Sequence, residues 1–181
     1  MPRRNEGQPK NFNGRPSLEK PSVNTHPSST PMNLTCYIHA WNELSAETLY
    51  TILALRAEVF VVEQNCPYQD VDGKDLQSLH VCGYSDSGQL CAYARLVKPG
   101  VSYEEWSIGR VVTSPQVRRT GTGEALMNTC MTYFSEHHIP AVRISAQSYL
   151  HDFYAKFGFV RVSEEYLEDD IPHMEMLFTQ S

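Results

Sequence analysis

The residues best suited to chemistry lie in a glycine-containing turn within residues 111–126, which read VVTSPQVRRTGTGEAL. The apolar start of this stretch is typical of a strand, and its end is typical of a helix. Gly121 and Gly123 therefore stand at a strand-to-helix junction. Uncovered backbone N–H groups and the positive end of a helix dipole at such a junction suit a phosphate or pyrophosphate. Arg118 and Arg119 can add charge-assisted contacts to the same anion.

Two familiar phosphate-binding motifs do not fit this turn. A P-loop needs a lysine after its second glycine, and none follows Gly123. A dinucleotide-binding fingerprint needs a small residue where Leu126 stands, and it belongs near a first strand rather than a fourth. The pattern Arg/Gln-x-x-Gly-x-Gly/Ala after a strand does fit, through Arg118, Gly121 and Gly123. The alternative is a tight turn whose glycines only permit unusual backbone angles.

Length and composition indicate one globular domain. The 181 residues are enough for one sizeable core and short for two. No apolar run approaches the roughly 18 residues that span a bilayer, and the N-terminus lacks the apolar stretch of a secretory signal. The five cysteines are odd in number and lie mostly in apolar surroundings, which favours reduced thiols. We therefore predict a cytoplasmic protein that does not act at a membrane.

Charge is distributed unevenly along the chain. Residues 1–31 carry five basic and two acidic side chains, so they are net +3, and the total of −6 leaves −9 for residues 32–181. An acidic globular part argues against nucleic acid as a partner and is compatible with a cationic amine substrate. The sequence leaves homodimerisation open.

The first 31 residues differ in composition from the rest. They hold six of the eleven prolines and almost no apolar periodicity. Such a segment buries too little surface to offset its ordering entropy, so we expect a disordered, proline-rich tail at 1–31 and a single domain at 32–181.

Hydrophobic periodicity and turn residues predict the elements of this domain. We expect an amphipathic helix over 46–62, opened by Ser45, and an irregular loop over 63–75. Two further helices are expected over 124–138 and 149–156. The expected strands cover 34–40, 79–85, 90–98, 105–113, 141–146, 159–163 and 173–178, with an acidic loop over 164–172. This order predicts an α+β fold with a mixed sheet of six to seven strands and helices packed on it.

Several segments together carry a family resemblance over residues 34–178. The segments are Leu55-Arg56 with 59–70, AYAR at 92–95, IGRV at 108–111, the glycine turn, AQ at 146–147, FY at 153–154, FGF at 157–159 and IPH at 171–173. On these residues the chain resembles the GNAT superfamily of acyl-CoA N-acyltransferases, and within it the ElaA-type branch.

The resemblance implies a splayed, mixed sheet with helices on both faces and a GNAT-type N-acetyltransferase domain over 32–181. An acyl-CoA, most simply acetyl-CoA as co-substrate, would lie where the fourth and fifth strands part. The backbone of Val111, Val112 and Thr113 would then face the pantetheine arm. The pyrophosphate would be wrapped by Arg118, Arg119, Thr120, Gly121, Thr122, Gly123 and Glu124.

Tyr154 is the side chain that the resemblance implicates most directly in catalysis. In the family, a tyrosine five residues before the Phe of a Gly-Phe pair lies beside the cofactor sulfur, and Tyr154 has that spacing to Gly158-Phe159. A phenol there can protonate the departing thiolate. The alternative is a core tyrosine that packs its helix on the sheet. Gln147 stands where many members have an asparagine, and it offers the same kinds of hydrogen bond to the pantetheine.

The attacking amine must lose a proton, so a general base is expected. Glu63 and His173 rank first, because both lie in the resembling segments at element ends. For each, the alternative is a structural hydrogen bond or a surface charge. The wider set of candidates adds Asp70, Asp72, His80, Glu104 and Glu105.

Two arginines and one histidine-cysteine group leave questions open. Arg56 and Arg110 could bind a substrate carboxylate or tie the 63–75 loop to the sheet. His80, Cys82 and Cys91 lack any metal-ligand spacing, so no metal site is expected.

The function expected is therefore an N-acetyltransferase in which a primary amine, on a small molecule or peptide, attacks acetyl-CoA directly in a ternary complex. Two alternatives remain. One is an acyltransferase of the homoserine-lactone-synthase type with a longer acyl donor, because Arg56 and Phe60 resemble its Arg-x-x-x-Phe helix. The other is a CoA-binding regulatory module without turnover.

Overall fold

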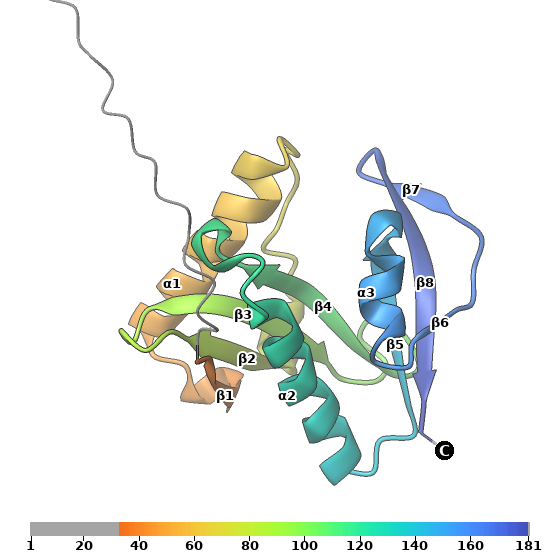
Figure 1. Ribbon diagram of the computed structural model, residues 1–181, viewed down its shortest axis with the longest axis horizontal. Helices are drawn as coiled ribbons and strands as arrows, with labels where there is room; N and C mark the ends of the chain where they lie inside the picture. Colours follow the sequence, from red (N-terminus) through yellow and green to blue (C-terminus); the bar gives the residue numbers. More distant parts are fainter. Residues whose placement is uncertain (1–32, 181) are drawn as a thin grey trace, which may run out of the picture.

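The computed structural model describes residues 33–180 (Figure 1). The tail expected at 1–31 lies outside these described residues. Within them, the chain forms one mixed sheet in the order β1-β2-β3-β4-β5-β8-β6, with β7 paired to β8. The strands are β1 (Thr35–Ala40), β2 (Ser78–Tyr84), β3 (Leu90–Val97), β4 (Trp106–Thr113), β5 (Ala141–Gln147), β6 (Val160–Arg161), β7 (Tyr166–Glu168) and β8 (Ile171–Thr179).

The strands β4 and β5 run parallel and part early. Their ladder contains only the pairs Trp106↔Val142 and Ser107↔Arg143. Every other neighbouring pair of the described sheet is antiparallel. Beyond Ser107 the two strands therefore diverge, and Figure 1 shows β5, β8 and α3 set apart from the β1–β4 half. The expected splayed, mixed sheet is confirmed.

Three helices accompany the sheet. Helix α1 (Ala46–Arg56) starts at Ser45, whose hydroxyl accepts a hydrogen bond from the Thr48 N–H at 3.0 Å, as an N-cap should. It continues as a π-helical segment over Ala57–Glu63. The other two are α2 (Thr122–Glu136) and α3 (His151–Ala155), the latter entered through a 3₁₀ turn at Ser148–Leu150.

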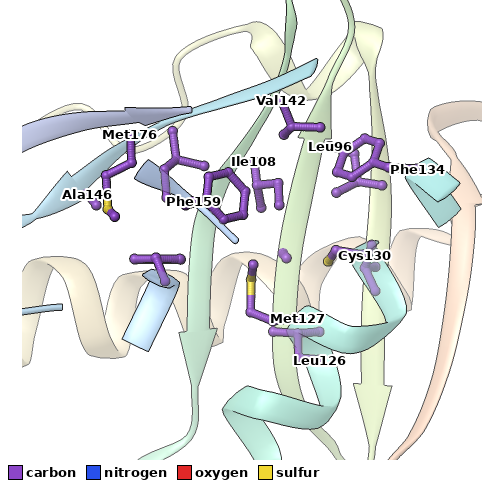
Figure 2. Packing of buried hydrophobic residues seen from close by; sticks show 14 of the residues in the cluster. Leu96, Ile108, Leu126, Met127, Cys130, Phe134, Val142, Ala146, Phe159 and Met176 are labelled. Carbon is purple, nitrogen blue, oxygen red and sulfur yellow. The ribbon is translucent and has the colours of Figure 1, made fainter. Parts of the chain in front are cut away.

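Alternation along β3 places helices on both faces of the sheet. Ala94 and Leu96 belong to the main hydrophobic core together with α2 residues such as Phe134, and Figure 2 shows this α2 face against β3 and β4. Tyr93 points to the other face, where it packs with Ile52 of α1. Because successive side chains of a strand alternate, a strand buried throughout needs cover on both sides. The expectation of helices on both faces is confirmed.

The structure has one strand more than the seven expected. The acidic stretch 164–172 was expected to be a loop, but it contains β7, which forms a tight hairpin with β8 through Glu168↔Ile171. Asp169 and Asp170 both have positive φ, 50° and 61°. Two central residues with positive φ make the turn that suits the twist of a hairpin, and aspartate tolerates this conformation. The acidic composition of this stretch is typical of a loop, so the sequence pattern did not predict the turn. None of the helices in residues 33–180 has the length and apolar character to cross a membrane.

Candidate active site

A cavity of about 650 Å³ opens where β4 and β5 part. One wall comes from the π-helical segment and from the bulged part of β4, and the other comes from the end of β5, α3 and the β7–β8 turn. A second hollow of about 230 Å³ lies at the N-terminus of α2. Thr113 and Arg118 line both. The two hollows therefore adjoin at Thr113 and Arg118, and together they are called the path from the α2 N-terminus into the sheet.

A β-bulge shapes the β4 wall. The register passes from Tyr93↔Val112 to Arg95↔Gly109, so Arg110 and Val111 both stand opposite the single residue between Tyr93 and Arg95. Arg110 adopts φ 54°, a conformation that is costly for a residue with a side chain. Bulges re-aim side chains and interrupt strand pairing. Here the bulge turns this stretch of β4 towards the cavity.

The glycine turn forms the floor of the second hollow. Gly121 has φ 85° and precedes α2, and a Cβ built on it would meet no atom within 4 Å. Among the described residues, no side chain caps this helix end, so its first N–H groups face the hollow. An open, glycine-bounded helix N-terminus is the geometry that binds a phosphate group. The residues therefore fit the pyrophosphate of an acyl-CoA.

All the cofactor-binding residues and leading catalytic candidates expected from the sequence, except Thr120, line one of the two hollows. The larger hollow is lined by Val111, Val112, Gln147, Tyr154, Glu63 and His173, both hollows by Thr113 and Arg118, and the smaller one by Arg119, Gly121, Thr122, Gly123 and Glu124. Thr120 instead supports the turn: its hydroxyl donates to the Val117 carbonyl at 2.7 Å and lies 2.8 Å from the Thr122 hydroxyl.

Tyr154 lies at the inner end of this path. Only 6% of it is exposed, and its ring packs edge-on against Phe153 and Phe159. Within residues 33–180 its hydroxyl has no hydrogen-bond partner, although the residue lines the cavity. Burial raises the pKa of Tyr154, so its phenol stays protonated at neutral pH. It is a packing residue that also lines the cavity and carries its phenol proton.

The structure separates the two leading candidates for the base. Both carboxylate oxygens of Glu63 accept hydrogen bonds from Arg118, at 2.6 and 2.7 Å, and these bonds lower the pKa of Glu63. His173 has Nδ1 2.8 Å from the carbonyl oxygen of Ile171. A carbonyl only accepts, so Nδ1 carries the proton and Nε2 of the neutral ring keeps its lone pair.

The remaining candidate bases have structural partners or lie away from the cavity. Asp70, Asp72 and His80 belong to a buried polar network, and Glu105 accepts two hydrogen bonds from Arg143. Glu104 is exposed and does not line the larger cavity. For these five residues a structural or surface role accounts for what the structure shows.

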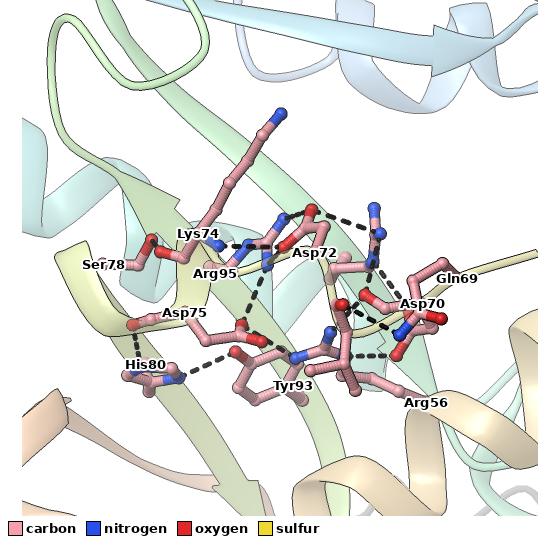
Figure 3. A network of polar contacts seen from close by, with 12 residues as sticks. Arg56, Gln69, Asp70, Asp72, Lys74, Asp75, Ser78, His80, Tyr93 and Arg95 are labelled. Atoms are coloured by element: carbon pink, nitrogen blue, oxygen red, sulfur yellow. Dashed lines mark hydrogen bonds and ion pairs between the residues drawn. The ribbon is translucent and has the colours of Figure 1, made fainter.

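The buried network ties the 63–75 loop to the sheet (Figure 3). Arg56, fully buried, donates from Nε to Asp70 and from Nη1 to Asp75, both at 2.9 Å. Arg95 forms a bidentate pair with Asp72 at 2.7 and 2.8 Å and also reaches Asp75 at 2.9 Å. Buried charges persist only when paired and hydrogen-bonded in this way.

Arg110 completes the network from the bulge. Its Nε donates to Asp70 at 2.7 Å, and its Nη2 approaches Asp72 at 3.4 Å. Three arginines and three aspartates thus balance in charge. Arg56 lines neither hollow and ties the loop to the end of α1, whereas Arg110 ties the loop to β4 and also lines the larger cavity.

Sequence reasoning gave no role to Arg95 and Asp75, the residues that link this network to β3 and to the 3₁₀ turn Lys74–Gln77. The alternation of β3 was an available signal, because Arg95 lies two residues from Tyr93 on the same face. Beneath the network, His80 lies between the Tyr93 hydroxyl at 2.8 Å and the Asp75 carbonyl at 3.1 Å. Burial lowers the pKa of His80, which keeps this ring neutral.

The charged side chains that line the larger cavity balance, although residues 32–181 as a whole carry a net charge of −9. The basic residues that line it are Lys74, Arg95, Arg110 and Arg118, and the acidic ones are Glu63, Asp72, Glu168 and Asp169. The acidic pair Glu168 and Asp169 comes from the β7–β8 turn, on the wall opposite the network residues Asp72, Arg95 and Arg110. Across residues 33–180, no group of three or more His, Cys, Asp or Glu side chains could hold a metal ion.

Comparison with protein families identifies the fold and the site together. Residues 44–179 match the family model described as an acetyltransferase (GNAT) domain. The chain belongs to this GNAT acetyltransferase family. The matched residues include both hollows and the whole buried network.

Individual relatives agree with this assignment. The chain is 45% identical to the protein ElaA of Escherichia coli over 139 residues, which cover 75% of this chain and 90% of that protein. The crystal structure of ElaA superposes with a TM-score of 0.75 at 40% identity, covering 81% and 99% of the two chains. An acyl-CoA N-acyltransferase from Pseudomonas aeruginosa gives a TM-score of 0.74 at 43% identity, with 82% and 99% covered. The GNAT protein is therefore an acyltransferase of the ElaA type.

The network predicts a pH dependence of stability. Burial alone would raise the pKa of Asp72, but hydrogen bonds from Arg95 outweigh it and hold the pKa at about 2, below the ordinary aspartate value of 3.8. A lowered folded-state pKa stabilises the protein above pH 3.8, and this contribution is lost as the pH falls towards 2. Relative to the wild type, Asp72→Asn should lose on the order of 1–2 kcal/mol of unfolding free energy near neutral pH.

Urea unfolding across this pH range measures the effect. The gap between the wild type and Asp72→Asn should shrink as the pH falls towards 2, whereas Asp86→Asn in the exposed β2–β3 turn should leave stability nearly unchanged. A gap that stays constant with pH would contradict the assigned cause.

Proposed function

We propose that this protein transfers the acetyl group of acetyl-CoA to a primary amine, by direct attack of the amine in a ternary complex. One observation carries the proposal: two adjoining hollows lead from the open N-terminus of α2 to a cavity lined by the buried Tyr154. A path with an anion site at one end and a proton donor at the other suits a long, phosphate-bearing thioester.

The donor would lie along the parted edge of β4. The turn at 118–124 would hold the pyrophosphate through its N–H groups, and Val111, Val112 and Thr113 would face the pantetheine arm. Gln147, at the end of β5, offers an amide to the same arm from the opposite wall. A backbone N–H of the bulged β4 could polarise the thioester carbonyl, in the manner of an oxyanion hole.

Tyr154 would act as the acid. As the new bond between the amine nitrogen and the acyl carbon forms, the carbon–sulfur bond breaks and the phenol gives its proton to the sulfur. A thiolate has a much lower pKa than an amine leaving group, so modest assistance is sufficient. The phenol of Tyr154 carries its proton at neutral pH, and because burial raises its pKa it gives that proton up only as negative charge develops on the sulfur.

His173 would accept the proton that the amine loses. Its Nε2 lone pair is free in the neutral tautomer, and the residue lines the cavity beside Gln147, its partner on β5. Glu63 is less suited as long as two hydrogen bonds from Arg118 hold its carboxylate and lower its pKa. A base that holds its charge so firmly takes up a proton poorly.

The acetyl group is the simplest donor, and longer acyl chains are the alternative. A CoA-dependent acyl-homoserine lactone synthase shares the fold with a TM-score of 0.69 at 16% identity, a likeness of fold alone. The balanced charges of the cavity accommodate an acceptor amine, free or at the end of a peptide, without selecting among amines.

Tyr154→Phe tests the acid. The variant should keep its affinity for acetyl-CoA but release free CoA thiol about 100-fold more slowly, because the proton donor is lost. Thiol release with a panel of primary amines and peptides measures this. Tyr149→Phe, the same change at an exposed residue of the cavity rim, is the matched control. If Tyr154→Phe turned over at the wild-type rate, Tyr154 would not be the acid. If the wild-type protein released no thiol with any amine, the proposal that it is an enzyme would be refuted.

His173→Gln tests the base. It should lower kcat/KM by about 100-fold near neutral pH, since general-base catalysis typically contributes at least that much. Glu63→Gln should lower kcat/KM by a smaller factor. A steady-state comparison of the two variants with the best amine of the panel decides between them. If Glu63→Gln proved the more damaging, the assignment of the base would be reversed.

Gly121→Glu tests the pyrophosphate site. A side chain with negative charge at the mouth of the second hollow should repel the donor and strain a residue with φ 85°. Calorimetric titration should show at least a tenfold loss of acetyl-CoA affinity. Gly121→Asn separates the two effects, because asparagine tolerates positive φ and carries no charge. Unchanged affinity in Gly121→Glu would mean that the pyrophosphate binds elsewhere.

A further inference from the structure

One ion pair joins the π-helical segment to the glycine turn. Glu63 is the last residue of the π-helical segment, and Arg118 belongs to the glycine turn, 55 residues away. Their bidentate contact joins Nη1 to Oε1 at 2.6 Å and Nη2 to Oε2 at 2.7 Å. The two side chains are 39% and 42% exposed, so the pair is open to solvent and to ligands.

The position of Arg118 gives this pair a consequence for binding. Arg118 lines both hollows, whereas Glu63 lines only the larger one. Carboxylates and phosphates bind the same planar fork of a guanidinium group. Both terminal nitrogens of Arg118 already donate to Glu63. An anion that reaches the glycine turn must therefore share Arg118 with Glu63 or displace it.

We infer that Glu63 is an internal competitor of the donor, which releases Arg118 when the pyrophosphate binds. This rests on the proposed function, since the donor is taken to be an acyl-CoA. Once Arg118 turns to the pyrophosphate, the Glu63 carboxylate is left facing the larger cavity, where the acceptor binds. Donor binding thereby adds a free negative charge to the acceptor side.

This exchange couples the two substrates. A cationic amine gains from the freed Glu63 carboxylate only when the donor holds Arg118, and by linkage the amine favours donor binding to the same extent. Among the described residues, the other carboxylate that acts on Arg118 is Glu58, which does so through longer-range charge and less strongly than Glu63. Glu63 is thus a positioning residue for Arg118 and a specificity element for the acceptor.

A double-mutant cycle on CoA affinity tests the competition. Calorimetric titration of CoA at low ionic strength into Glu63→Gln should give a Kd about two- to five-fold lower than wild type, the range expected from an exposed ion pair. In an Arg118→Gln background, adding Glu63→Gln should change the Kd by less than about 1.5-fold. Pantetheine lacks the pyrophosphate, so its affinity should not respond to Glu63→Gln.

The matched control removes a second acid of the same cavity that does not contact Arg118. Glu168→Gln should leave the CoA Kd within about 1.5-fold of wild type if direct competition, rather than net cavity charge, is the cause. Weaker or unchanged CoA binding in Glu63→Gln, or an equal gain in Glu168→Gln, would overturn the inference. Wild type that binds no CoA at all would instead refute the proposed function, so the two failures are distinguishable.

Discussion

The early parting of β4 and β5 is the constraint on which the site depends. Two parallel strands that pair through only two residues leave the rest of their facing edges without partners in the sheet. Backbone N–H and C=O groups are costly to bury unpaired, so a split of this kind is stable only when something polar occupies it. The cavity, the bulge at Arg110 and the glycine turn all lie along this split.

The ionic network holds the walls of the split in place. It fixes the irregular 63–75 loop onto β3 and β4 by pairing three arginines with three aspartates, and it leaves no net charge behind. Removing one member would leave its partner charged and unpaired in a buried site, which is costly. These ion pairs therefore hold the loop in place although it has little regular secondary structure. The same anchoring stabilises the positive φ of Arg110, because the guanidinium is held at Asp70.

Much of the fold could be predicted because it depends on local patterns. The alternation on β3, the Ser45 cap and the glycine turn at Gly121 each act over a few residues. The β7–β8 hairpin was missed because aspartates with positive φ read as a polar loop, and only their pairing with β8 reveals the turn. The π-helical continuation of α1 was likewise not predicted, since seven residues are too few for its i→i+5 spacing to stand out from an α-helical pattern.

The sequence by itself determined the family and the residues that line the path, because glycine turns and strand ends are local signals. Only the tertiary structure decided what those side chains do to one another. Glu63 and Arg118 were assigned to different tasks, yet they hold each other across 55 residues, and His173 keeps a free Nε2 through a carbonyl two residues away. Long-range ion pairs depend on how elements pack, and no local pattern in the chain specifies that distance.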